Sequence, residues 1–115
     1  MNNFFKKNKY FLISIGAVPG AIFRWQIDDV FIVNTLGCFL LGIVNSMPGK
    51  RIYKLIFGIG FCGSLTTFSG WSFYLFKLIS QGLYKLFFLN SVLIVLIGLF
   101  AICLGDLFAK KFLIS

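Results

Sequence analysis

Four long apolar runs constrain this chain more than any other feature. They cover residues 10–23, 30–47, 52–79 and 86–104, and only short polar or glycine-containing connections separate them. A chain of 115 residues that is 59% hydrophobic and 12% charged has too little interior to hide such runs from water. An apolar stretch of about twenty residues is long enough to cross a bilayer as a helix. The sequence therefore predicts an all-α integral membrane protein.

The runs predict four transmembrane helices, over about residues 10–25, 30–47, 52–79 and 85–108, within a single domain spanning residues 1–115. The first run is the only short one, and Trp25 can extend it as an interfacial aromatic residue. Gly16 and Gly20 are four residues apart, so they share a helix face that favours close packing against another helix. Lysines precede this helix as in a signal peptide, but no cleavage site leads into a polar domain, so the helix is expected to remain.

The net charge of +8 does not indicate a nucleic-acid partner, because the cations lie at the ends of the apolar runs. If the four helices alternate in direction, eight lysines and arginines lie on the side of both termini and three on the other. This imbalance favours cytoplasmic termini. Arg24, at the end of the first helix, either extends to the interface or attracts anions at a pore mouth.

Few residues in the chain can support catalysis or proton transport. There is no histidine, and no carboxylate lies in the middle of a run, so the sequence does not predict an enzyme. The same absence disfavours a proton-coupled small multidrug exporter, the other well-known four-helix protein of this length, which needs a carboxylate in its first helix. The three cysteines have no CxxC spacing and do not indicate a zinc site. Passive permeation or a structural role remains.

The third run contains an unusual cluster of small residues, GIGFCGSLTTFSG, at residues 58–70. We expect the helix to loosen near residues 63–67, and unwound backbone at bilayer depth is tolerated only in protein or beside a wet cavity. Such breaks supply carbonyls for cations and donors for anions, whereas the alternative is simple close packing of helices. Asn34 has the same two interpretations, a bond between helices or an anion donor. Phe68 and Trp71 project from one face, and their ring edges either approach an anion or face lipid or the core.

Three segments carry a resemblance to a known family: GAIFRW at 20–25, VNTLGCFLLG at 33–42 and GFCGSLTTFS at 60–69. In this order and spacing the sequence resembles the Fluc (CrcB) family of bacterial fluoride channels over almost its entire length. The resemblance implies passive export of cytoplasmic fluoride by an antiparallel, dual-topology-type dimer whose third helix is broken at its centre. It also implies a structural sodium ion, not transported, on backbone carbonyls at positions matching Gly63 and Thr66. The implied fluoride pore residues are Asn34, Thr67, Phe68, Ser69, Trp71 and Ser91.

The chain departs from the family pattern at three positions. Trp71 replaces the second phenylalanine of a pair, Tyr74 replaces a glutamate, and Phe87 replaces a tyrosine if Ser91 is aligned with the family serine. The last change removes a hydroxyl from the polar track. Together with the charge imbalance, it favours a heterodimer with an oppositely oriented paralogue over a homodimer. The alternative function is a non-conducting membrane scaffold or partner subunit.

Overall fold

The computed structural model describes the backbone of residues 2–113 and the side chains of residues 8–113. Its elements, in chain order, are α1 (Asn2–Ile27), α2 (Val30–Ser46), α3 (Arg51–Tyr53), η1 (Lys54–Cys62), α4 (Gly63–Leu65), α5 (Phe68–Ser80), α6 (Tyr84–Phe108) and η2 (Ala109–Leu113). Both η elements are π-helical. The prediction of an all-helical chain is confirmed for the described residues.

Three helical stretches are long and apolar enough to cross a membrane: residues 8–27, 51–80 and 84–113. The remaining long helix, α2, is also apolar but has only 17 residues. These lengths and compositions describe a multi-pass membrane protein. The distribution of exposed residues is that of a membrane protein. Leu96, Leu99 and Phe100 of α6 are each more than half exposed, and no polar side chain is buried in the described part of the chain.

The first helix is longer than the predicted span of residues 10–25, and α2 is the shortest of the four main helical stretches. No glycine or proline precedes Tyr10, and lysine is a good helix former, so α1 continues towards the N-terminus. A tight connection sets the start of α2: Asp28 has a φ of 52°, and the Asp29 carboxylate accepts a hydrogen bond from Ile32 N at 3.1 Å. The side chains of Lys6 and Lys7, which enter the predicted orientation, lie outside the described residues.

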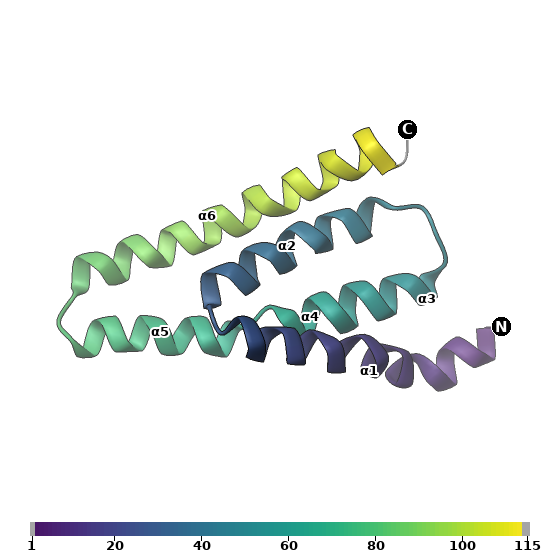
Figure 1. Ribbon diagram of the computed structural model, residues 1–115, viewed down its shortest axis with the longest axis horizontal. Coiled ribbons are helices and arrows are strands. Elements are labelled where there is room, and N and C mark those ends of the chain that lie inside the picture. The colour runs from purple at the N-terminus through teal and green to yellow at the C-terminus, as the bar shows by residue number, and fades with distance from the viewer. Residues whose placement is uncertain (1, 114–115) are drawn as a thin grey trace.

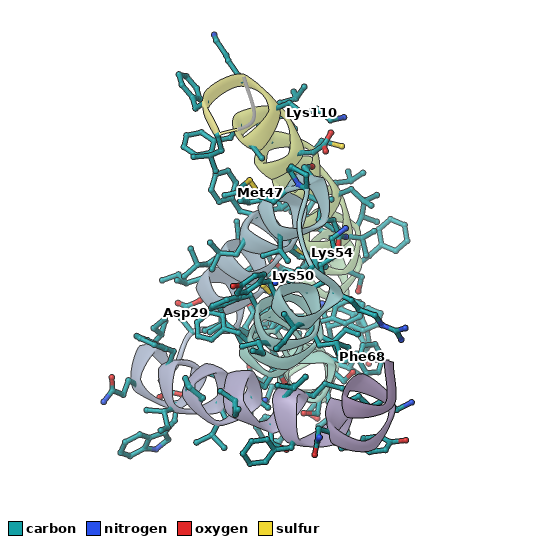
Figure 2. The ribbon with its side chains drawn as sticks, turned by 90° about the vertical axis from the view of Figure 1, so that its right-hand side faces the viewer. Asp29, Met47, Lys50, Lys54, Phe68 and Lys110 are labelled. Carbon is teal, nitrogen blue, oxygen red and sulfur yellow. The ribbon has the colours of Figure 1, made fainter. Side chains whose placement is uncertain are left out.

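The helices lie side by side in the order α6, α2, η1, α1 (Figures 1 and 2). The closest neighbours are α2 with α6 and α1 with η1, and α2 also contacts η1. Both termini and the connection at residues 47–50 lie at the same end of a molecule that measures 54 × 32 × 22 Å. Figure 2 looks at this end, where Lys50 and Lys54 lie on either side of the short helix α3 and Lys110 lies in η2.

The predicted packing face of the first helix is confirmed. A Cβ atom added to Gly16 would overlap the carbonyl oxygen of Ile56, and one added to Gly20 would overlap the hydroxyl of Ser64. The Ser64 hydroxyl donates a hydrogen bond to Ala17 O at 2.8 Å across the same contact. The backbones of α1 and the η1–α4 segment therefore touch directly, which only small residues allow.

Beyond the ends of α1 and α2, α5 and the first half of α6 continue as an antiparallel pair (Figure 1). Gly82, whose φ is 74°, permits the tight turn that joins them. Phe73 and Phe76 on α5 are 59% and 63% exposed, so much of this extension is uncovered within one chain.

Candidate functional site

Two adjacent threonines separate α4 from α5. Thr66 (φ −76°, ψ 153°) and Thr67 (φ −145°, ψ 114°) both have extended backbones. The Thr66 hydroxyl donates to Cys62 O at 3.0 Å, at the end of the preceding helix. The Thr67 hydroxyl oxygen accepts a hydrogen bond from Gly70 N at 2.9 Å and caps the start of α5. Each threonine thus stabilises one side of the interruption.

The Asn34 side chain, from α2, binds the backbone of Thr67 at both ends. Its Oδ1 accepts a hydrogen bond from Thr67 N at 2.7 Å, and its Nδ2 donates to Thr67 O at 3.3 Å. A primary amide within hydrocarbon is costly unless it is paired, and so are the N–H and C=O of an interrupted helix. Asn34 satisfies both sets of groups at once. We call this pair of hydrogen bonds the Asn34–Thr67 clasp.

The interruption also leaves a row of free acceptors. In a continuous helix Thr67 N would donate to the carbonyl of Gly63, but here it donates to Asn34 instead. The carbonyl oxygens from Gly63 to Thr66 lie where the helix ends and its intrahelical donors run out, and no side chain of the described residues donates a hydrogen bond to them. Carbonyl groups at such an interruption can bind a hard cation.

A groove of about 580 Å³ lies against the interruption, with walls from α2, η1, α4, α5 and α6. It brings together six of the eight residues to which the sequence assigned sodium or fluoride: Asn34, Gly63, Thr66, Thr67, Phe68 and Trp71. The Phe68 and Trp71 rings meet edge to face, with centroids 5.4 Å apart. No lysine, arginine or carboxylate is among the described residues that line the groove.

The remaining predicted residues lie elsewhere. Ser69 is exposed, and its hydroxyl shares a 3.2 Å hydrogen bond with that of Thr67. Ser91 donates to Phe87 O of its own helix at 2.7 Å and does not line the groove. Arg24 is exposed near the end of α1. Ser69 and Arg24 thus place a hydroxyl and a cation on surfaces that one chain leaves open, whereas Ser91 is half-buried.

Two features were not predicted from the sequence. The indole Nε1 of Trp71 is buried and has no hydrogen-bond partner, the only such side-chain atom in the described part of the chain. At the end that carries the termini, Ser46 of α2 donates to Asp106 of α6, which also pairs with Lys110 at 3.1 Å. Asp106 is the only acidic residue after Asp29 in the sequence, and this rarity could have indicated that its side chain pairs with other residues.

Comparison with known proteins gives consistent matches along the chain. The sequence profile of the family described as "CrcB-like protein, Camphor Resistance (CrcB)" matches residues 11–106. The chain is 59% identical over 106 residues to the protein named Fluoride-specific ion channel FluC 1 of Prochlorococcus marinus (strain NATL2A), covering 92% of this chain and 93% of that protein.

More distant relatives carry similar names. Fluoride-specific ion channel FluC 2 of Prochlorococcus marinus (strain MIT 9313) is 48% identical over 75 residues, which are 65% of this chain and 60% of that protein. Fluoride-specific ion channel FluC of Azobacteroides pseudotrichonymphae genomovar. CFP2 is 31% identical over 122 residues, covering 90% of this chain and 98% of that protein. No solved structure shows a significant match.

Proposed function

Because the chain belongs to the CrcB-like family, we propose that it is a subunit of a fluoride-selective channel through which cytoplasmic fluoride leaves the cell down its gradient. The observation that carries this proposal is 59% identity, over nearly the whole chain, to a protein named as a fluoride-specific ion channel. Such a channel needs no energy source and no catalytic residue. It would lower the fluoride concentration in the cytoplasm.

The groove beside the interruption supports a path for the anion. Fluoride is small and strongly hydrated, so a pore must replace its water with other hydrogen-bond donors. The proposed path uses Asn34, Thr67, Phe68 and Trp71 in the groove. It continues with the hydroxyl of Ser69 and the cation of Arg24 on the open surfaces and with the half-buried hydroxyl of Ser91. Since the described groove lining has no fixed positive charge, it would not trap the ion electrostatically.

A structural sodium ion fits the free carbonyl groups at the end of α4. Gly63 is exposed within one chain and lines the groove together with Thr66, and no described side chain donates a hydrogen bond to the carbonyls from Gly63 to Thr66, which lie at the end of a helix. Carbonyl oxygens of unwound membrane helices suit sodium. We propose that Gly63 and Thr66 supply ligands from one chain and that a second chain completes the set. This ion would stabilise the dimer without crossing the membrane.

The proposed assembly is an antiparallel dimer in the bacterial inner membrane, in which the interruption lies at the centre of the third membrane pass. The open groove and the uncovered α5–α6 extension favour a second subunit on this face. The eight-to-three charge imbalance supports a paralogue of opposite orientation as the partner. The relatives numbered FluC 1 and FluC 2 are consistent with such pairs.

Fluoride efflux from liposomes tests the function. The purified chain, alone and together with a co-expressed paralogue from the same genome, is reconstituted with sodium present, and release of fluoride and chloride is followed with ion-selective electrodes. We expect rapid fluoride release with chloride retained. Absence of fluoride release in both preparations would contradict the channel and favour the non-conducting scaffold.

Reporter fusions at the C-terminus test the orientation. We expect the C-terminus to lie predominantly in the cytoplasm, because the termini share the side with eight cations. Equal populations on the two sides of the membrane would contradict the heterodimer and favour a homodimer of dual topology.

A further inference from the structure

We propose that the indole N–H of Trp71 is a hydrogen-bond donor to fluoride in this groove and thereby a determinant of selectivity against larger anions. The inference rests on the proposed function, since it assigns a specific atom to the fluoride path. It also distinguishes this group from the weaker ring edges of the neighbouring aromatic residues.

The first argument is the isolation of the Trp71 Nε1 atom. An indole N–H can only donate, and when tyrosine or tryptophan is buried its polar atom usually finds a partner. In the described part of the chain this atom is the one buried side-chain nitrogen or oxygen without one. An unpaired buried donor is costly, so an acceptor that reaches it is bound favourably. The site that Trp71 lines is the groove beside the interruption.

The second argument is an inventory of the other donors in the groove. The Thr66 hydroxyl is committed to Cys62 O, and one amide hydrogen of Asn34 is committed to Thr67 O. The Thr67 hydroxyl shares its hydrogen bond with Ser69. Thr35 is only partly buried and its hydroxyl can accept as well as donate. Among the described side chains that line the groove, Trp71 therefore offers the one fully buried nitrogen or oxygen donor without a partner, whereas the second amide hydrogen of Asn34 belongs to a partly buried side chain.

The third argument is the local geometry. Trp71 lies in the first turn of α5, one turn after the cap residue Thr67, and its ring packs edge to face on Phe68 at 5.4 Å. Contact with fluoride requires a side-chain rotation, because Nε1 is covered within one chain. The Phe68 ring is 75% exposed, and exposed side chains change rotamer within nanoseconds. Movement of the exposed Phe68 ring, which packs on the Trp71 ring, is the proposed step that opens the N–H to a passing ion.

Nuclear magnetic resonance of the full-length 15N-labelled chain tests the proposal directly. The chain has two tryptophans, so a detergent-solubilised sample gives two indole N–H signals, which Trp25→Phe and Trp71→Phe assign. We expect fluoride to shift the Trp71 indole proton downfield in a saturable manner. The Trp25 signal is the internal control, because this side chain is 77% exposed at the end of α1. Chloride at equal concentration should leave both signals in place.

Flux through liposomes provides the second measurement. Trp71→Phe keeps a phenyl ring at this position and removes the pyrrole part of the indole together with its N–H. A hydrogen bond to an ion is worth enough that the apparent fluoride affinity should fall about tenfold. Trp25→Phe should conduct as the unmodified chain does.

The outcomes separate the two proposals. If fluoride does not change the chemical shift of the Trp71 indole proton in a preparation that conducts fluoride, the N–H is not a donor to the ion, and the proposed channel function is unaffected. Unchanged affinity in Trp71→Phe, with a weakened dimer in light scattering, also overturns it, because the N–H then binds the second subunit. A saturable shift in a preparation that releases no fluoride, with or without the paralogue, supports the donor site and refutes the channel.

Discussion

Replacing Asn34 with aspartate changes one nitrogen to an oxygen and therefore tests both roles of this side chain. In the Asn34–Thr67 clasp, Oδ1 accepts from Thr67 N at 2.7 Å and Nδ2 donates to Thr67 O at 3.3 Å. Asn34→Asp keeps the acceptor, but it places a second oxygen against the Thr67 carbonyl. The variant has nearly the same volume, so packing in the groove is otherwise preserved.

The expected loss of stability and the expected loss of fluoride binding in Asn34→Asp have separate causes. Loss of the donor leaves the Thr67 carbonyl with only the long hydrogen bond from Trp71 N at 3.4 Å and sets a second oxygen against it, which costs about 1–3 kcal/mol in the stability of the interruption. If the carboxylate is ionised, its repulsion of a fluoride ion about 4 Å away is about 4 kcal/mol at an effective dielectric constant of 20. That energy corresponds to about a thousandfold weaker fluoride binding. Conduction should therefore be lost, and thermal stability in detergent should fall.

Fluoride efflux from liposomes and thermal unfolding in detergent measure the two effects separately. Asn45→Asp is the matched control, since Asn45 lies on the same helix, is exposed and makes no side-chain hydrogen bond in the described part of the chain. We expect this control to conduct and unfold as the unmodified chain does. Wild-type fluoride efflux in Asn34→Asp would refute Asn34 as a residue of the anion path. An unchanged unfolding temperature would refute the clasp as a source of stability.

Two further variants test the elements around the groove. Thr67→Val removes the oxygen that caps α5 and should lower the free energy of unfolding in detergent by about 1 kcal/mol. Thr35→Val is the control, because the Thr35 hydroxyl makes no hydrogen bond in the described part of the chain, and it should leave the free energy of unfolding unchanged. Equal losses of stability in the two variants would contradict the cap. Gly16→Ala places a methyl group against the Ile56 carbonyl and should destabilise the chain by about 1–3 kcal/mol in the same assay. Gly49→Ala is its control because no atom lies within 4 Å of the added Cβ, and similar stability of the two alanine variants would refute the close contact of α1 with η1.

The features that depend on local composition were predictable from the sequence. The apolar runs give the helical stretches, and Asp28 and Asp29 mark the first connection because aspartate tolerates a positive φ and caps helices. The face formed by Gly16 and Gly20 follows from their spacing of four residues.

The features that depend on contacts between distant residues could not be predicted in this way. Asn34 and Thr67 are 33 residues apart, and a single sequence does not reveal which backbone an amide will bind, so both interpretations of Asn34 remained open. The π-helical geometry of η1 lies where α1 packs backbone against backbone, with Gly16 beside Ile56. The isolation of Trp71 Nε1 is likewise a result of packing, which no residue type signals by itself.

The interruption at Thr66 and Thr67 explains how one chain can offer groups for a cation and an anion at nearly the same place. The helix that ends at Leu65 leaves carbonyls without partners, and a helix C-terminus carries partial negative charge. The helix that begins at Phe68 presents N–H groups and partial positive charge, only part of which Thr67 satisfies by its bond to Gly70. A continuous helix would pair these groups with one another and offer neither. Because Asn34 pairs with both backbone groups of Thr67 within the interruption, we expect its loss to weaken the proposed sodium site and the proposed fluoride path together, rather than the anion path alone.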